Sequence, residues 1–181
     1  MSVCDPEFGF PNECIIMYPD LQGKVAIITG AGRRKGLGEA MARRLAAEGC
    51  KVVLSDLGAA QGEQMPESAI GTRSELEQIA AEISSAGGEA HAAVCNVLQE
   101  SDVAALVAAA VKQFGRLDIM VNNAGIGYLM RPIVATEQSN WDAVLGVNLR
   151  GVFLGIKHAA IQMIKQGQGG GTIPVASGRR Y

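Results

Sequence analysis

Aromatic residues are scarce in this sequence, and neither sign of charge is in large excess. Only 4% of the 181 residues are aromatic, whereas 48% are hydrophobic and 23 are glycine. Small and branched aliphatic side chains are typical of buried parallel strands packed against helices rather than of a β-sandwich. A chain of this length has enough residues for one domain with a large core, so we expect a single domain.

The weak net charge restricts the classes of partner. The formal net charge is −2, from 16 basic and 18 acidic residues. Nucleic acids and anionic membranes attract proteins with an excess of positive charge, so we expect no nucleic acid as a partner. The sequence shows no apolar run near 18 residues and no basic N-terminal segment of the secretory kind, so we also expect no membrane contact.

Cysteine and histidine do not form any ligand pattern. The four cysteines lie at scattered positions without a CxxC spacing: Cys4, Cys14, Cys50 and Cys95. A chain of this size does not need disulfides for stability, so we expect reduced thiols, a cytoplasmic location and no metal site. The two histidines, His91 and His158, are too far apart in sequence to predict a zinc site.

Apolar segments of strand and helix type alternate from Lys24 onward. Residues 1–20 contain three prolines and predict an extended arm, and residues 21–181 predict one domain. The expected strands span residues 25–29, 51–56, 90–95, 117–121 and 172–176. Residues at helical spacing predict four helices, carrying Leu37–Leu45, Leu76–Ile83, Val103–Phe114 and Trp141–Met163. Ser101 is the expected N-cap of the third helix.

This alternation predicts the fold class. Strands joined through helices require crossover connections, which give a parallel sheet with helices on both faces. We therefore expect an α/β fold, a Rossmann-like doubly wound sheet in three layers. In such folds ligands bind beyond the carboxyl ends of the strands, where the strand order reverses.

A glycine-rich segment follows the first expected strand and opens a helix. It reads Thr29-Gly30-Ala31-Gly32-Arg33-Arg34-Lys35-Gly36-Leu37-Gly38. Glycines let the backbone turn tightly and approach a diphosphate, which the free N–H groups at the helix start then bind. We predict that a dinucleotide is held here by Gly30, Gly32, Arg33, Gly36, Leu37 and Gly38.

Asp56 ends the second expected strand and is followed by Leu57. An acid at this position accepts hydrogen bonds from a ribose diol and repels a 2′-phosphate, so NAD is favoured over NADP. The basic residues Arg33, Arg34 and Lys35 could neutralise such a phosphate, which keeps NADP as the alternative. The other interpretation of these three residues is a plain solvated loop.

Two further motifs complete a family pattern. Asn122-Asn123-Ala124-Gly125 follows the fourth expected strand, and Asn148 lies in the last expected helix. Together with the glycine motif, these residues resemble the short-chain dehydrogenase/reductase family. The family's TGxxxGxG appears here with two extra residues. The resemblance implies that Asn123, Ala124 and Gly125 lie beside the cofactor and that Asn148 holds a water of the proton relay. It also implies that Asn96 and Val97 meet the adenine, an amide replacing the family's acid.

The resemblance extends from Lys24 to about Gly171, roughly the first two thirds of a family domain. Relatives continue with a strand IVNxSS and then YxxxK, which supply the catalytic serine, tyrosine and lysine. Here Pro174 interrupts the strand pattern, and Ser177 is either the serine or a terminal loop residue. Tyr181 has no lysine after it. We therefore expect a fold without the family's last strands, with an exposed sheet edge and exposed apolar helix faces.

The resemblance implies an NAD(P)-dependent oxidoreductase that transfers a hydride between a nicotinamide cofactor and a small-molecule alcohol or carbonyl substrate. The exposed helix faces predict a homo-oligomer. Two alternatives remain at this stage. One is a non-catalytic fragment that binds a dinucleotide or forms oligomers. The other is a methyltransferase, which shares a glycine loop and an acid after the second strand.

Overall fold

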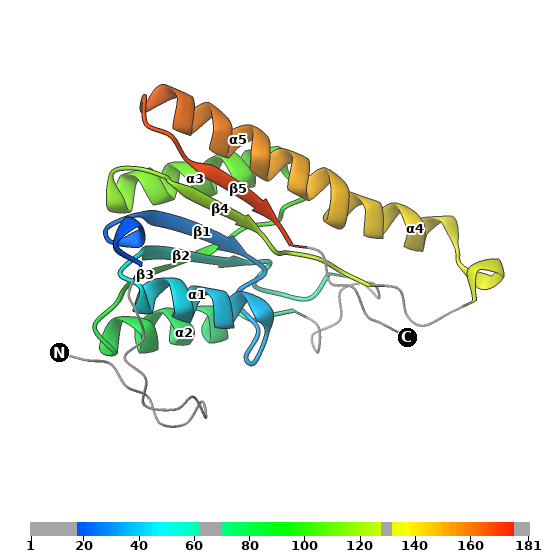
Figure 1. Cartoon of the computed structure of the whole chain (residues 1–181). Coiled ribbons are helices and arrows are strands. Elements are labelled where there is room, and N and C mark those ends of the chain that lie inside the picture. The colour runs from blue at the N-terminus through cyan, green and yellow to red at the C-terminus, as the bar shows by residue number, and fades with distance from the viewer. Residues whose placement is uncertain (1–17, 62–69, 128–131, 176–181) are drawn as a thin grey trace.

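The computed structural model describes residues 18–61, 70–127 and 132–175, which form a five-stranded parallel sheet. The strand order is β3-β2-β1-β4-β5 (Figure 1). The strands are β1 (Val25–Thr29), β2 (Lys51–Asp56), β3 (Glu89–Val94), β4 (Ile119–Asn122) and β5 (Gly171–Pro174). Each lies within two residues of its predicted start, and the doubly wound α/β arrangement is confirmed.

The central strand β1 is buried along its whole length, as its unbroken apolar sequence requires. It pairs on one side with β2, where Val25 faces Lys51, and on the other with β4, where Ala26 faces Ile119. The chain thus builds the sheet outward from β1 in one direction and then in the other. The reversal lies between β1 and β4, so a ligand is expected beyond the carboxyl ends of these two strands.

Two pairs of helices cover the two faces of the sheet (Figure 1). Helices α1 (Leu37–Ala47) and α2 (Arg73–Ser85) cover one face, and α3 (Glu100–Phe114) and α5 (Val152–Lys165) cover the other. Alternate side chains of β1 therefore enter different cores: Ala26 and Ile28 pack with Leu76 and Ile79 of α2, and Ile27 packs on the face of α3 and α5. The three layers are those predicted.

The predicted cap of the third helix is wrong. Helix α3 begins at Glu100 with Gln99 as its N-cap residue, and Ser101 lies inside the first turn. The helix starts early because Gln99 already turns back to the carbonyl of Asn96 (2.9 Å) and Asp102 accepts a bond from the Asn96 amide (3.2 Å). Helix α2, in contrast, has a complete capping box between Thr72 and Glu75.

The predicted long helix is present but contains a π-helical segment. It comprises α4 (Gln138–Leu145), η5 (Gly146–Gly151) and α5, and Asn148 lies in the π-helical part. Gly151 packs against Val97, whose Cγ2 would lie 3.0 Å from a Cβ on the glycine. Two short 3-10 turns, η2 (Pro19–Leu21) and η4 (Ile133–Ala135), complete the described elements.

By length and composition, the 28 residues Gln138–Lys165 could cross a membrane, with a mean hydropathy of 1.3 over the best window. Arg150 and Lys157 interrupt the apolar sequence of this segment, so it contains no unbroken apolar run of 18 residues. The core helix of a soluble protein can meet the same criterion. Leu154, Ala159 and Met163 bury one side of α5 against the sheet, and the absence of membrane contact stays a prediction.

Strand β5 accommodates Pro174, which the sequence pattern made doubtful in an interior strand. Pro174 is the last residue of β5 and pairs with Asn122 of β4. In the part of the chain that the structure describes, β5 is the outermost strand on this side of the sheet. Since one side of β5 has no ladder partner there, the missing N–H of proline is tolerated.

Candidate functional site

The residues predicted to bind a dinucleotide gather at the carboxyl ends of the strands. The segment that connects β1 to α1 (residues 30–36, the glycine loop) lies between the ends of β2 and β4. Asp56 ends β2 and Leu57 follows it, and Asn123, Ala124 and Gly125 follow β4. The predicted residues therefore meet at the edge where the strand order reverses.

Thr29 and Asn123 join the glycine loop to the turn after β4. The buried hydroxyl of Thr29 accepts bonds from the backbone amides of Asn123 (3.1 Å) and Ala124 (3.0 Å). In return, the side-chain Nδ2 of Asn123 donates to the carbonyls of Thr29 (2.8 Å) and Gly30 (3.1 Å). These reciprocal bonds fix the loop and the turn relative to each other. The Asn122-Asn123-Ala124-Gly125 motif predicted Asn123 as a site residue, whereas no role was predicted for Thr29.

Close backbone packing explains why glycine is required at two positions of this segment. Gly30 has φ +67°, and a Cβ there would lie 2.8 Å from Cα of Ala124. A Cβ on Gly38, in the first turn of α1, would lie 2.4 Å from the carbonyl oxygen of Gly30. A side chain at either position would separate α1 from the end of β1. The loop therefore has the close backbone approach that a diphosphate cradle needs.

The start of α1 provides the donors for an anion. Gly36 is the N-cap residue and has no side chain to satisfy the first amides of the helix, which belong to Leu37, Gly38 and Glu39. Such amides have no intrahelical acceptor and lie at the positive end of the helix dipole. The close backbone packing of the glycine loop and the free amides at the start of α1 together fit the diphosphate of a dinucleotide.

Asp56 is fixed by the glycine loop as well as by its own strand. Its Oδ2 accepts from the Gly32 amide (2.8 Å), and its Oδ1 accepts from the Leu57 amide (2.8 Å). Burial raises the pKa of this carboxyl, and the bonds from Gly32 and Leu57 and the charge of Arg33 partly offset the rise. The carboxylate oxygens retain lone pairs that can accept from two ribose hydroxyls.

The three basic residues of the glycine loop have different surroundings. Arg33 accepts a bond from the Gly36 amide at its backbone carbonyl (3.2 Å), but its exposed side chain makes no hydrogen bond or ion pair with any residue of 18–61, 70–127 or 132–175. Arg34 donates to both carboxylate oxygens of Glu82 on α2, at 2.7 and 2.6 Å. Lys35 has the left-handed φ of 57°, and its backbone amide donates to Glu39 (2.6 Å).

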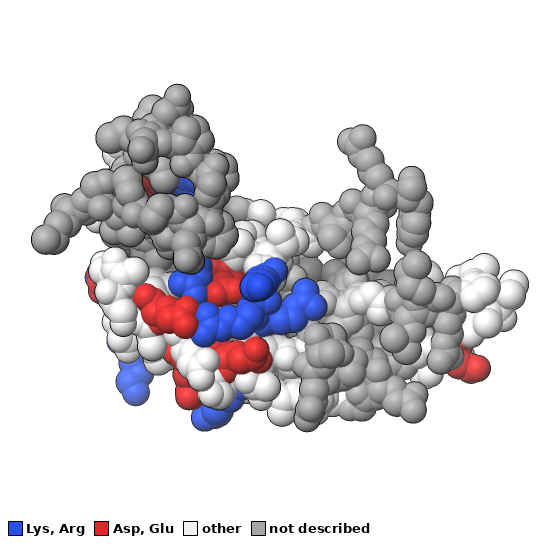
Figure 2. All heavy atoms as spheres, turned by 90° about the horizontal axis from the view of Figure 1, so that it is seen from below, with Lys and Arg blue, Asp and Glu red and all other residues white. Residues whose placement is uncertain are grey.

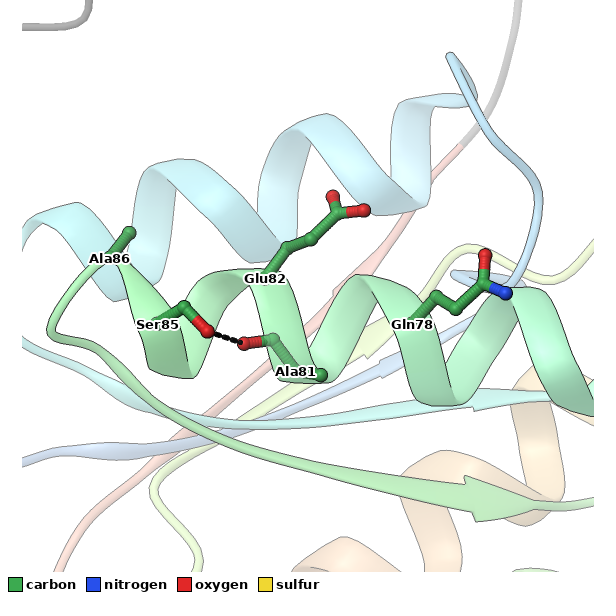
Figure 3. Close-up of a pocket in the computed structure, with 5 residues that line it drawn as sticks. All are labelled: Gln78, Ala81, Glu82, Ser85 and Ala86. Carbon is green, nitrogen blue, oxygen red and sulfur yellow. Dashed lines mark hydrogen bonds between the residues drawn. The ribbon is translucent and has the colours of Figure 1, made fainter.

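Two acids and two arginines link the glycine loop to both helices beneath it. Glu39 of α1 also accepts from Arg43 (2.8 Å), and Arg43 reaches Glu82 (2.5 Å). Arg34 and Arg43 together lower the pKa of Glu82 to about 2. Figure 2 shows basic side chains between acidic ones on this face of the molecule, and in Figure 3 Glu82 projects from α2 toward α1.

Asn96 and Val97 follow β3, as the family resemblance requires of residues that meet an adenine. The side-chain oxygen of Asn96 accepts from the Leu98 amide (3.0 Å), and its Nδ2 donates to Gln61 (3.4 Å). The amide is therefore held at the sheet edge with one acceptor lone pair still open. Val97 packs against Gly151 and so connects this edge to the π-helical segment.

Asn148 lies near the predicted cofactor residues, and both of its side-chain polar atoms are engaged. Its Oδ1 accepts from the amide of Ile126 (2.9 Å), and its Nδ2 donates to the carbonyl of the same residue (2.9 Å). These two hydrogen bonds anchor the turn after β4 to the long helix. The geometry thus gives the side chain a positioning task that the sequence did not predict.

Ser177 and Tyr181 lie outside the described residues. The hollow in Figure 3 contains none of the predicted cofactor residues and shares only Glu82 and Gln78 with the contacts of Arg34: Gln78, Ala81, Glu82, Ser85 and Ala86 line it along α2. Among the described residues, no cluster of three or more acidic, cysteine or histidine side chains could hold a metal ion.

Sequence reasoning missed three residues that hold the site together: Thr29, Glu39 and Glu82. Thr29 belongs to the family's glycine motif, so a signal for it was present. Glu39 stands four residues before Arg43, a helical spacing that predicts an ion pair. Glu82 carries no signal, because its partner Arg34 lies 48 residues earlier in the sequence.

Comparisons with known proteins agree with this geometry. The sequence profile of a family described as short chain dehydrogenase matches residues 24–179. A short-chain dehydrogenase/reductase of Armillaria gallica is 40% identical over 157 residues, 87% of this chain and 54% of that protein. One from Hericium erinaceus is 43% identical over 159 residues, 85% of this chain and 58% of that protein.

A solved structure of a short-chain oxidoreductase has a fold similar to that of this chain. The crystal structure of a metagenomic short-chain oxidoreductase in complex with NADP matches with a TM-score of 0.67 and 34% sequence identity. The match covers 82% of this chain and 60% of that one. The chain spans about half the length of the curated relatives that it matches.

Proposed function

The chain belongs to the short-chain dehydrogenase family, and from this we propose that it binds a nicotinamide dinucleotide as part of an NAD(P)-dependent oxidoreductase. The observation that carries the proposal is the reciprocal bonding of Thr29 and Asn123, which presents the glycine loop and the start of α1 beside Asp56. The methyltransferase alternative is overturned, because the family match extends over residues 24–179.

Each part of the site has one binding task in this proposal. The first amides of α1, at Leu37 and Gly38, bind the diphosphate. Asp56 accepts bonds from the adenosine ribose, and Asn96 and Val97 contact the adenine. The turn at Ala124 and Gly125 borders the nicotinamide half. When bound, the nicotinamide ring supplies or accepts the hydride that is exchanged with an alcohol or carbonyl substrate.

Proton transfer needs an acid or base beside the substrate oxygen. The 181 residues contain no Tyr-x-x-x-Lys. We propose Ser177 as the group that contacts the substrate oxygen, and Asn148 as a positioning residue, because its side chain is committed to the backbone of Ile126. A proton relay through Asn148 would have to use a water held in addition to these bonds.

Both forms of the coenzyme are candidates. Asp56 favours NAD, because a carboxylate at the end of the second strand repels a 2′-phosphate. The solved relative at 34% identity was crystallised with NADP, and this chain has three basic residues in the glycine loop. We therefore propose NAD as the preferred coenzyme and NADP as an accepted one.

Titration calorimetry of the full chain with NAD⁺, NADH, NADPH and S-adenosylmethionine tests this proposal. Circular dichroism must first show folded material. We expect saturable binding of the nicotinamide coenzymes and no heat from S-adenosylmethionine. If folded protein takes up neither coenzyme at millimolar concentration, the proposal is wrong. Binding without turnover of simple alcohols and ketones would favour the non-catalytic alternative for this chain.

We also propose that the protein forms homo-oligomers through the outer side of the long helix. The apolar side chains exposed there are Leu145, Leu149, Phe153, Ile156, Ile161 and Ile164. An exposed apolar surface of this extent is typical of an interface. Light scattering after gel filtration tests it. The Phe153→Glu variant should be a monomer while the unchanged chain is not, and a monomeric unchanged chain would contradict the proposal.

A cytoplasmic location is the last part of the proposal. Cys50 and Cys95 are free thiols buried in the fold, and burial raises the pKa of Cys95 to about 12. Thiols in this state suit a reducing compartment. Fractionation of cells that express the tagged protein tests the location, and recovery in the membrane or secreted fraction would contradict it.

A further inference from the structure

The π-helical segment Gly146–Gly151 contacts both connections that border the proposed coenzyme site. On one side, Asn148 bonds the backbone of Ile126, in the turn after β4. On the other side, the segment lies against Val97 and Leu98, which follow β3. In the proposed function, one short piece of helix therefore supports two ends of the site: the nicotinamide end after β4 and the adenine end after β3.

The π-helical geometry allows close packing against the connection after β3. A π-helix joins residues i and i+5 in one turn, so Gly146 and Gly151 lie on the same side of the segment. A Cβ on Gly146 would lie 3.1 Å from Cδ2 of Leu98, and one on Gly151 would lie 3.0 Å from Cγ2 of Val97. The two glycines therefore let the helix backbone approach both residues closely.

Arg150 adds a charged hydrogen bond to this packing. Its guanidinium donates to the backbone carbonyl of Leu98. Residues two apart on a helix point to different sides, so Asn148 and Arg150 bond different connections. A charged donor makes a stronger bond than a neutral one, although solvent reduces the strength for this exposed side chain. Arg150 thus ties the connection after β3 to the long helix.

Leu98 is directly bonded to a residue that is proposed to contact the adenine. Its amide donates to Oδ1 of Asn96 (3.0 Å), and the amide of Gln99 donates to the Asn96 carbonyl (2.9 Å). These bonds make the connection after β3 a tight turn, in which Val97 lies between the two bonded residues. Because the turn is tight, holding the carbonyl of Leu98 also fixes the positions of Asn96 and Val97.

We infer that Arg150 is a positioning residue for the adenine end of the coenzyme: through the carbonyl of Leu98, it holds Asn96 and Val97 where they contact the adenine. The inference rests on the proposed function, in which those two residues bind the adenine. Two side chains of the π-helical segment then have separate tasks, because Asn148 holds the turn at the nicotinamide end.

Calorimetry of the full chain with NADH and with ADP tests this inference. ADP carries the adenine half of the coenzyme and a diphosphate but no nicotinamide. Arg150→Met removes the charged donor and should weaken the binding of both ligands by the same factor, roughly three- to tenfold. Arg150→Lys keeps a charged donor and should stay within about twofold of the unchanged chain. Asn148→Ala should weaken NADH binding by a larger factor than ADP binding, since its contact lies at the nicotinamide end.

Lys157→Met is the matched control. Lys157 lies further along the long helix, is exposed like Arg150, and donates to Glu100 in the first turn of α3 (2.6 Å). It also joins the long helix to a segment after β3, but its partner belongs to α3 rather than to the turn at the adenine. We expect this variant to change either dissociation constant by less than about twofold. Gel filtration must show the same oligomeric state for all variants.

Hydrogen exchange without ligand gives a measurement that does not involve binding. Arg150→Met should speed exchange of the Leu98 amide and leave that of the Ile126 amide unaltered, whereas Asn148→Ala should do the reverse. A general loss of stability would speed both amides alike, and that result in Arg150→Met would contradict the positioning role.

The outcomes separate the inference from the proposed function. If the folded, unchanged chain binds neither NADH nor ADP, both fail. If it binds them and Arg150→Met leaves the two dissociation constants unaltered, or Lys157→Met raises them as much, the inference alone is wrong. Should Arg150→Met not fold, Arg150→Gln, which has a neutral and shorter donor, is measured in its place. Unaltered ADP binding in that variant would overturn the inference as well.

Discussion

Replacing Thr29 by valine removes the hydroxyl that connects the glycine loop to the turn after β4, with almost no change in shape. Three bonds are affected. The amide of Ala124 loses its acceptor (3.0 Å), whereas the amide of Asn123 keeps a second acceptor, the carbonyl of Val121 at 3.1 Å. The third bond, from the hydroxyl to the carbonyl of Val121, is long at 3.4 Å. The loss is therefore dominated by one amide.

An amide left without a partner in a buried place costs about 1–3 kcal/mol, and the two weaker bonds add roughly 0.5 kcal/mol each. We expect Thr29→Val to lower the free energy of unfolding by about 2–4 kcal/mol. For a chain of this size that corresponds to a decrease of the melting temperature of about 4–16 °C. The affinity for the coenzyme should fall as well, because the loop and the turn are no longer held together.

Urea denaturation followed by circular dichroism measures the difference in stability. Thr29→Ser is the matched control, because it keeps the hydroxyl and removes one buried methyl group, at a cost of about 1 kcal/mol. If Thr29→Val is no less stable than Thr29→Ser, the hydroxyl does not hold the two segments together and the reasoning is refuted. Equal slopes of the unfolding curves are needed for this comparison.

Three further predictions concern the same site. Gly38→Ala should destabilise the fold by about 1–3 kcal/mol, because its Cβ would meet a loop carbonyl at 2.4 Å, whereas Gly127→Ala, in open space, should stay within about 0.5 kcal/mol in the same urea assay. Burial raises the pKa of Asp56 above its ordinary value of 3.8. The ionised carboxylate therefore lowers the stability of the folded protein at pH values above the raised pKa, and this loss disappears when the pH falls below 3.8. NAD⁺ binding in calorimetry should therefore weaken on acidification before an ordinary aspartate would protonate, and Asp56→Asn should bind weakly at every pH. Asn148→Ala should speed hydrogen exchange of the Ile126 amide, and unchanged exchange would contradict the anchoring role.

The fold could be predicted because its signals are local. The strand at Val25–Thr29 is a short apolar run between glycines and polar residues, and the helix ending at Phe114 shows apolar residues at helical spacing. Such patterns reflect burial on one or both faces. The predicted cofactor residues also came together, because parallel strands bring their carboxyl ends to one edge.

What the sequence did not reveal depends on contacts between distant segments. The pairing of Arg34 with Glu82 exists only after α1 and α2 have packed side by side. The π-helical segment at Gly146–Gly151 follows an apolar spacing that an ordinary helix also satisfies, so the pattern gave no sign of it. The N-cap at Gln99 was missed for a different reason: Ser101 is the better capping residue by type, but the turn at Asn96 starts the helix earlier.

The π-helical segment divides the long helix into two parts of unequal local stability. Helix α4 buries none of its residues and extends past the end of the sheet (Figure 1), whereas α5 lies against the core. Cooperative opening units in proteins are set by buried contacts, so α4 can unwind as a separate foldon up to Gly146 while the sheet stays intact. Limited proteolysis of the native protein should therefore cut within Gln138–Leu145 before it cuts α5.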